Sequence, residues 1–98
     1  MYEVVLVKDV EKYLKSCPSK MRERFLRQLS TLEESPRTHG DMLVGEFHGL
    51  YRMKLFYNGV QYRAIYDIQE EKVRVLVLFI GKREQVYEKA KRKKIAKK

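Results

Sequence analysis

The sequence predicts a single α+β domain with the element order β-α-α-β-β-β-α, in which helices pack on a small antiparallel sheet. Asn58-Gly59 separates two apolar-rich runs, and this dipeptide is the strongest short-range signal of a β-hairpin. Residues 73–80 are nearly all apolar, which is typical of a strand buried on both faces. Residues 20–34 carry apolar side chains at helical spacing. Strands that follow one another through short turns pair antiparallel and leave the helices to cover the sheet.

The length of the chain sets the number of domains. Its 98 residues are enough for one small hydrophobic core, and 44% of them are hydrophobic. The sequence contains no internal repeat and no low-complexity linker. We therefore expect one domain over residues 1–98, with residues 93–98 as a basic tail.

The chain is expected to begin with a strand and a short helix. Residues 2–7 alternate in polarity as a strand does. Asp9 is a candidate N-cap for a helix over residues 10–16, because a carboxylate accepts hydrogen bonds from the first free amides. Cys17-Pro18 ends this helix, since the residue before a proline avoids helical dihedrals.

A second helix is expected over residues 20–34, with Ser19 as its candidate N-cap. Its apolar positions are Met21, Phe25, Leu26, Leu29 and Leu32. Residues 35–41 contain serine, proline, glycine and aspartate, a composition typical of a loop.

The hairpin places three cations on one face of the predicted sheet. Its strands are residues 50–57 and 60–66, and a two-residue turn between them puts Lys54 opposite Arg63. Side chains alternate faces with a period of two, so Arg52 shares this face. Like charges directly opposite one another destabilise a sheet, so the arrangement indicates a phosphate-binding site rather than a structural role.

The remaining elements follow from turn signals. Glu70-Glu71 marks the next turn, the apolar strand occupies residues 73–80, and Gly81 ends it. Residues 84–92 form the expected final helix.

The composition limits the class of partner and the location. A net charge of +9 and a pI near 9.7 predict a polyanionic partner, which is a nucleic acid, an acidic protein or an anionic membrane surface. No apolar run approaches the roughly 20 residues of a membrane span. The first residues lack the features of a signal peptide, and a single cysteine suits a reducing compartment, so we expect a cytoplasmic protein. One cysteine and two histidines show no metal-ligand spacing, and no cofactor is expected.

Several short motifs, taken in order, resemble the RelE toxins of the RelE/ParE superfamily of type II toxin–antitoxin systems. They are Glu34-Ser35-Pro36-Arg37, the hairpin 51–66, Glu71-Lys72-Val73, and Gly81-Lys82-Arg83-Glu84 followed by Val86-Tyr87. The resemblance covers the whole chain and is densest over residues 35–92. It implies a RelE-like fold, an endoribonuclease that cuts mRNA in the ribosomal A site, and an acidic RelB-like antitoxin as partner.

The resemblance also implies which residues are catalytic. Lys54 matches a catalytic lysine, and Arg52 stands where RelE has another lysine. Arg63, Arg83 and Tyr87 match an arginine of the next strand, the arginine of the Gly-Lys-Arg motif and a tyrosine of the last helix. RNA supplies its own nucleophile, since a 2′-hydroxyl can attack the adjacent phosphorus to give a 2′,3′-cyclic phosphate without a metal.

Each of these residues has an expected task in that reaction. Lys54 is the candidate base, because arginine stays protonated. Arg52 and Arg63 are expected to stabilise phosphate charge through their planar guanidinium groups. Arg83 is expected to act near the leaving oxygen, and Tyr87 to stack on a base.

Other cations are expected to give general contact with RNA or the ribosome, which sets affinity and salt dependence without reading sequence. They are Lys20, Arg24, Arg27, Lys82, Lys91 and Arg92. His48 has the side chain most often used as an acid or base, but it falls in an expected loop and matches no RelE catalytic position.

Three alternatives remain open at this point. A ParE-like protein shares the fold but poisons DNA gyrase and lacks this catalytic set. A degenerate member that only binds is favoured by Arg52 in place of lysine. A general RNA-binding protein lacks support, because no RNP-type aromatic motif or GXXG loop is present. Each site residue also has a purely structural alternative. The hairpin cations would then form a solvated sheet face, Arg83 would pair with Glu84, and Tyr87 would pack in the core.

Overall fold

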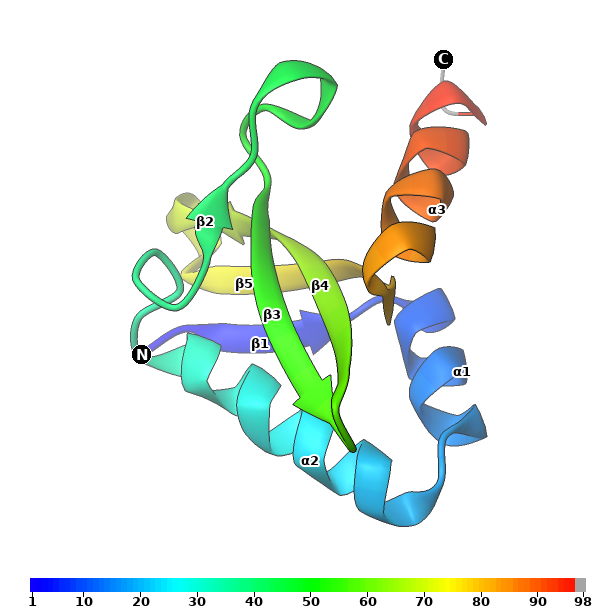
Figure 1. Ribbon diagram of the computed structural model, residues 1–98. Coiled ribbons are helices and arrows are strands. Elements are labelled where there is room, and N and C mark those ends of the chain that lie inside the picture. Colours follow the sequence, from blue (N-terminus) through cyan, green and yellow to red (C-terminus); the bar gives the residue numbers. More distant parts are fainter. Residues whose placement is uncertain (97–98) are drawn as a thin grey trace.

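The computed structural model describes residues 1–96 and has a five-stranded sheet in the order β1-β5-β4-β3-β2 (Figure 1). Its strands and α-helices are β1 (Glu3–Leu6), α1 (Lys8–Ser16), α2 (Ser19–Ser30), β2 (Asp41–Met42), β3 (Tyr51–Tyr57), β4 (Val60–Gln69), β5 (Arg74–Lys82) and α3 (Arg83–Ala96). The predicted α+β class is confirmed. No helix in the described part of the chain has the length and apolarity needed to cross a bilayer.

The sheet is mixed rather than wholly antiparallel. β1 pairs in parallel with β5, the last strand along the chain, with Val4 beside Val75. Only strands joined by a tight turn are obliged to pair antiparallel, and β1 is instead followed by two helices. The prediction of an antiparallel sheet is therefore correct for β2 to β5 and wrong for β1.

The register of the hairpin is confirmed. Tyr57 pairs with Val60 and Lys54 pairs with Arg63 across β3 and β4. Asn58 and Gly59 both have positive φ angles, 50° and 76°, as a type I′ turn requires. The turn residues thus set which side chains lie opposite one another along both strands.

The most buried strand is β4, not β5. Five consecutive residues of β4, Tyr62 to Tyr66, are buried, whereas Leu76 and Leu78 of β5 are only half-buried. β4 lies in the middle of the sheet and is covered on both faces, while β5 has the short β1 as its outer neighbour. Gly81 also does not end β5, which continues to Lys82.

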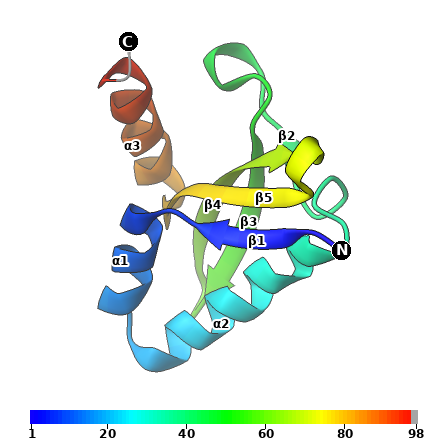
Figure 2. The same ribbon diagram turned by 180° about the vertical axis from the view of Figure 1, so that it is seen from behind.

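The two faces of the sheet carry separate hydrophobic clusters. α1 and α2 cover one face with side chains that include Val10, Leu14, Phe25 and Leu29. α3 covers part of the other face, where Val86 and Ala90 pack with Ile65. Figures 1 and 2 show α3 rising from the end of β5, well apart from α2. The face under α3 is therefore less completely covered than the face under α1 and α2.

Both predicted helix caps are wrong. α1 begins at Lys8 after Val7, with no side-chain cap, and Asp9 instead forms a 2.7 Å ion pair with Lys93 of α3. Ser19 is the first residue of α2 rather than its cap, because Pro18 already occupies the capping position. α2 also ends at Ser30, and a short 3₁₀ turn follows it over Thr31–Glu33.

The last helix is longer than expected at both ends. α3 spans Arg83–Ala96, so residues 93–96 of the expected basic tail are helical. Lysine and arginine are good helix formers, which is why the basic run continues the helix. Residues 97–98 of the expected tail lie outside the described residues.

The loop expected at residues 35–41 ends in a short strand that sequence reasoning missed. In β2, Asp41 pairs with Arg52 and Met42 pairs with Tyr51. Gly40 lies immediately before this strand, and a Cβ atom there would overlap both the Tyr66 hydroxyl and the Arg52 carbonyl oxygen. Only glycine therefore allows β2 to approach β3 this closely.

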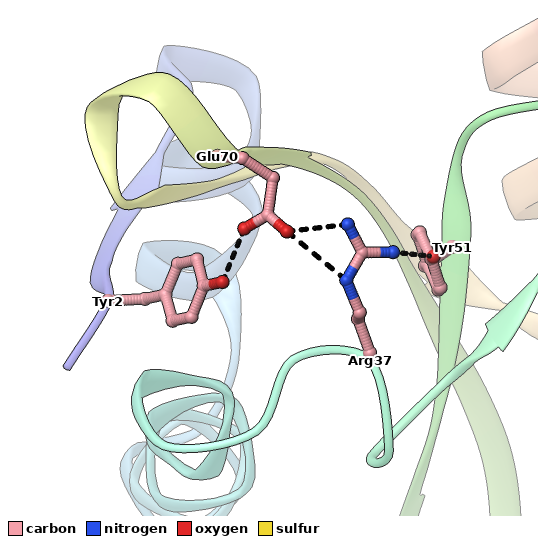
Figure 3. A network of polar contacts seen from close by, with 4 residues as sticks. All are labelled: Tyr2, Arg37, Tyr51 and Glu70. Atoms are coloured by element: carbon pink, nitrogen blue, oxygen red, sulfur yellow. Dashed lines mark hydrogen bonds and ion pairs between the residues drawn. The ribbon is translucent and has the colours of Figure 1, made fainter.

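A polar network joins segments at the end of the sheet where β1 and β3 begin (Figure 3). Glu70 accepts a hydrogen bond from the Tyr2 hydroxyl and two from Arg37, at 3.2 Å from Nε and 2.6 Å from Nη2. Arg37 Nη1 donates to the Tyr51 hydroxyl at 2.7 Å. The network joins the start of β1, the loop before β2, the start of β3 and the β4–β5 turn.

This network makes stability depend on pH through Glu70. Hydrogen bonds from Tyr2 and then Arg37 hold the pKa of Glu70 below its usual value. Its stabilising contribution is therefore complete above the unfolded-state pKa of about 4.3 and is lost as the pH falls through the lower folded-state pKa. We expect Glu70→Gln to lower the melting temperature more at pH 7 than at pH 3, as measured by circular dichroism.

The neighbouring Glu71 provides the control for this pH effect. It has no ion pair or side-chain hydrogen bond to any residue in the described range 1–96. Glu71→Gln should change the melting temperature little at either pH. A Glu70→Gln effect of equal size at pH 7 and pH 3 would show that the carboxylate charge is not what stabilises the network.

Val73 occupies a strained backbone position that offers a stabilising substitution. Its φ and ψ angles are 48° and 53°, and this left-handed conformation costs L-residues about 1–2 kcal/mol. The side chain is 47% exposed, so little burial is lost on truncation. Val73→Gly should raise the free energy of unfolding by about 1 kcal/mol, or the melting temperature by roughly 4–8 °C.

An exposed valine in ordinary strand conformation is the matched control. Val60 is 40% exposed and begins β4, so Val60→Gly should lower the melting temperature because glycine weakens a strand. Differential scanning calorimetry of both variants checks the sign. A lower melting temperature for Val73→Gly than for the parent would contradict this prediction.

Candidate functional site

The cations of the hairpin lie on the sheet face that α3 only partly covers. Met53 and Leu55 of β3 enter the opposite core, so the alternating Arg52 and Lys54 emerge beside α3. Arg63 of β4 lies directly opposite Lys54. Lys54 is exposed, Arg52 is half-buried, and Arg63 is only 8% exposed. The three cations therefore range from the buried Arg63 to the solvent-exposed Lys54.

Tyr87 of α3 joins the two arginines. Its hydroxyl oxygen accepts hydrogen bonds from Arg63 Nη1 at 3.0 Å and from Arg52 Nη1 at 3.5 Å. The Arg63 guanidinium carbon lies 5.7 Å from the centroid of the Tyr87 ring, within the range of a cation–π contact. Three of the residues singled out in the sequence thus meet in one cluster, with Lys54 beside them.

The position of Tyr87 follows from the way α3 packs. Val86 and Ala90 are one helical turn apart, and both are fully buried against Ile65 of β4. Tyr87 follows Val86, so its ring lies at the edge of this contact, where it meets the neighbouring Arg63. The apolar contact of α3 therefore sets the place of the tyrosine hydroxyl.

The electrostatics of the cluster favour an anion. The hydrogen bond to Tyr87, with a smaller contribution from Asp41, raises the pKa of Arg52. The Nε atoms of Arg52 and Arg63 are buried and have no hydrogen-bond partner among the described residues. A buried unsatisfied donor costs about 1–3 kcal/mol, so a ligand that brings acceptor oxygens would relieve this cost. Phosphate is such a ligand, and guanidinium groups match its geometry.

Arg83 is the predicted catalytic residue that the structure does not join to the cluster. It is the first residue of α3, is exposed, and has no side-chain hydrogen bond or ion pair within residues 1–96. In particular it does not pair with Glu84. Gly81, two positions earlier, pairs with Arg63 across the sheet, so Arg83 follows the cluster closely along the chain without contacting it through a hydrogen bond.

Two residues near the cluster were missed by sequence reasoning. Asp41 Oδ2 lies 3.7 Å from Arg52 Nε, and the Phe47 ring centroid lies 6.1 Å from that of Tyr87. Asp41 lies in the two-residue strand β2 and Phe47 in the 3₁₀ turn Gly45–Phe47, and both elements are too short for a periodic pattern to place their side chains. The local sequence signal for a change of chain direction in the segment before β3 is its pair of glycines, Gly45 and Gly49, which adopt positive φ angles of 71° and 96°.

His48 is not part of the cluster. It follows the 3₁₀ turn Gly45–Phe47, and its side chain is exposed. Its imidazole has no hydrogen bond or ion pair to the part of the chain that the structure covers. Within that part, no group of three His, Cys, Asp or Glu side chains is arranged to hold a metal ion.

The cations expected to give general RNA contact fall into two groups. Lys20, Arg24 and Arg27 belong to α2, whose buried residues pack on the face opposite the cluster. Lys82 ends β5, while Lys91 and Arg92 are exposed on α3. Arg92 also lines a cavity of about 720 Å³ between α1 and α3. Only this second group lies on elements that adjoin the cluster.

Fold and cluster together define a small α+β domain with a cationic sheet face. The chain matches, over residues 4–91, the family described as ParE-like toxin of type II bacterial toxin-antitoxin system. It is 39% identical over 74 residues to the mRNA interferase toxin RelE of Escherichia coli K12, which covers 74% of this chain and 75% of that protein. The chain therefore belongs to the ParE-like toxin family, and its resemblance to RelE toxins is confirmed.

Solved structures agree with this assignment. The isolated E. coli RelE toxin superposes with a TM-score of 0.70 at 30% identity, covering 95% of this chain and 98% of that one. The toxin of the intact E. coli RelBE toxin–antitoxin complex gives 0.67 at 28% identity, covering 84% and 96%. The archaeal RelE–RelB complex from Pyrococcus horikoshii gives 0.59 at 25% identity, covering 84% and 94%. The α+β fold is thus that of RelE toxins.

Proposed function

We propose that this chain is a metal-independent mRNA endonuclease that acts in the ribosomal A site. The observation that carries this function is the cluster of Arg52, Arg63 and Tyr87 beside Lys54. The curated relative is named an mRNA interferase, which supports mRNA as the substrate. Arg63 Nε is buried without a hydrogen-bond partner among the described residues, and Arg52 Nε has only the 3.7 Å ion pair with Asp41, which supports binding of a phosphate at this point.

The reaction assigns one task to each residue. Arg63 and Arg52 hold the scissile phosphate and stabilise the charge that develops on its oxygens. Lys54 takes the proton of the 2′-hydroxyl, whose oxygen attacks phosphorus as the bond to the 5′-oxygen breaks. Arg83 stabilises the leaving oxygen, which takes a proton from water. The products are a 2′,3′-cyclic phosphate and a 5′-hydroxyl.

Tyr87 has two tasks in this proposal. Its hydroxyl holds both guanidinium groups in place, so it acts as a positioning residue for Arg52 and Arg63. Its ring, which is half-buried next to Phe47, stacks on a base. Tyr87→Phe should separate the two tasks, because it keeps the ring and removes the hydroxyl.

The ribosome supplies alignment that the protein lacks. An exposed lysine without a histidine partner is an imperfect base, so cleavage of free RNA should be slow. Holding the 2′-hydroxyl in line with the phosphate is worth roughly 7–11 kcal/mol, and A-site mRNA is held in this way by the ribosome. Cleavage should therefore depend on the ribosome.

Single-turnover cleavage of mRNA on programmed ribosomes tests the proposed function. We expect cleavage with EDTA-treated protein and a 2′,3′-cyclic phosphate at the new end. The family description also names ParE-like toxins, so inhibition of gyrase supercoiling is the parallel assay. No cleavage together with gyrase inhibition would assign the chain to the gyrase-poisoning branch, and inactivity in both assays would indicate a degenerate binding protein.

The partner we infer is an acidic, RelB-like antitoxin. The charge of +9 favours an acidic chain, and the matched structures include the E. coli RelBE complex and the P. horikoshii RelE–RelB complex. A disordered acidic segment can fold on binding and cover a large surface, including the Arg52–Lys54 face. The proposed substrate is mRNA on ribosomes, so the cytoplasm is the location that follows.

Co-expression with the adjacent gene checks this partner. We expect a co-purifying complex that does not cleave mRNA, because the antitoxin neutralises or covers the cations of the cluster. Elution of the two proteins as separate peaks at physiological salt would contradict the prediction. Reversing charge at Lys15, an exposed residue of α1, is a control that leaves the cluster intact.

A further inference from the structure

The exposed ring of Phe56 lies on the same sheet face as the cluster. Phe56 is two positions beyond Lys54 on β3, so both side chains leave the sheet on the face of Arg52. Leu55, between them, is fully buried in the opposite core, whereas Phe56 is 46% exposed. No aromatic or cation–π contact engages the Phe56 ring within residues 1–96.

The backbone beneath this ring is held from two sides. Phe56 pairs with Gln61 across the hairpin, whose type I′ turn fixes the register. On the other side, Arg24 Nε of α2 donates a hydrogen bond to the Phe56 carbonyl oxygen at 2.9 Å. The ring is thus presented to solvent from a fixed point, which reduces the entropy lost when a ligand binds it.

Two aromatic rings adjoin the cationic row at different places. With a rise of about 3.4 Å per residue, the Cα atom of Phe56 is about 7 Å from that of Lys54 and about 14 Å from that of Arg52, so Phe56 lies beyond the Lys54 end. Tyr87 lies against the two arginines, since its hydroxyl accepts hydrogen bonds from both Arg63 and Arg52. Single-stranded RNA is bound by this combination of a cationic path for the phosphates and rings for the splayed bases.

We propose that Phe56 is a stacking subsite for a nucleobase of single-stranded RNA, on the opposite side of the scissile phosphate from Tyr87. This subsite rests on the proposed function, since it assumes that RNA occupies the cationic row. A single exposed apolar side chain needs no partner in general. The alignment of Phe56 with Arg52, Lys54 and Arg63 is what favours RNA over an apolar partner.

The test is a fluorescence titration with a short single-stranded RNA that carries 2-aminopurine and a 2′-deoxy sugar at the cleavage position. Stacking on an aromatic ring quenches 2-aminopurine. Phe56→Leu should lose the quenching and weaken binding by about tenfold, because stacking of one base contributes on that order. Phe56→Trp should retain both. Val60→Ala removes part of an exposed side chain from the opposite face of the same hairpin and should change neither.

The outcomes separate the subsite from the proposed function, because this RNA cannot be cleaved. Phe56-dependent quenching in a protein that fails to cleave on ribosomes supports the subsite and overturns the proposed function. Normal cleavage by the parent, with affinity and quenching unchanged in Phe56→Leu, overturns the subsite alone. A parent protein that binds no RNA, or a Phe56→Leu variant that loses only its antitoxin, also overturns the subsite.

Discussion

Arg63→Met is expected to slow cleavage of ribosome-bound mRNA by about 10²- to 10³-fold, the usual effect of removing one preorganised charge-stabilising donor. Methionine preserves much of the buried stem of Arg63, which is only 8% exposed, but removes the guanidinium that donates to Tyr87. The loss should appear in the single-turnover rate constant. Binding to ribosomes, measured by co-sedimentation, should be nearly unchanged.

A second charge removal distinguishes chemistry from general electrostatics. Lys15→Met removes one exposed cation from α1, away from the cluster. It should weaken ribosome binding slightly, in a salt-dependent way, and leave the rate of the chemical step unchanged. If Arg63→Met and Lys15→Met affect the single-turnover rate equally, Arg63 has no role in the chemical step.

Val77→Asp should unfold the protein. Val77 is fully buried in β5, where the core under α1 and α2 offers no partner for a carboxylate. Burying an unpaired charge costs several kcal/mol, which is comparable with the roughly 5–15 kcal/mol that separates folded and unfolded states of a small domain. The far-UV circular dichroism spectrum at 25 °C should be that of an unfolded chain, and a temperature scan should show no cooperative transition.

The same substitution at an exposed valine is the control. Val44 is 80% exposed in the segment before β3. Val44→Asp should therefore change the free energy of unfolding by no more than about 0.5 kcal/mol, with a correspondingly small shift of the melting temperature. A cooperative transition for Val77→Asp near the parent temperature would mean that β5 is not part of the stable core.

Local rules predicted the hairpin and failed where distant segments meet. Asn58-Gly59 fixes the register by its own dihedrals, so the positions of Lys54 and Arg63 follow from the sequence. Nothing local places β1 beside β5, because α1, α2 and three other strands separate the two along the chain. The sequence thus indicates the cations of the cluster but not the direction of the first strand.

The cluster was predictable only as far as regular elements carry it. Arg52 and Lys54 lie on a strand, where period-two alternation assigns them a face. Asp41 lies in the two-residue strand β2 and Phe47 in a short 3₁₀ turn, where no periodic pattern can be recognised, and their contacts with Arg52 and Tyr87 appear only in three dimensions. The predicted N-cap at Asp9 is wrong for a related reason, since its carboxylate forms an ion pair with Lys93, which is distant in the sequence.

Because β2 is short, much of β3 has no neighbouring strand on the side away from β4. β2 pairs only with Tyr51 and Arg52, so residues 53–57 have no strand beside them on the side away from β4, where Arg24 of α2 binds the Phe56 carbonyl oxygen (Figure 1). Open edges recruit strands from other molecules, and charged side chains on the edge are a common protection. Lys54 lies on this edge, so the same lysine that acts as the proposed base also keeps the molecules apart. Neutral variants at position 54 would then aggregate as well as lose activity, and their oligomeric state has to be measured before the loss is attributed to chemistry.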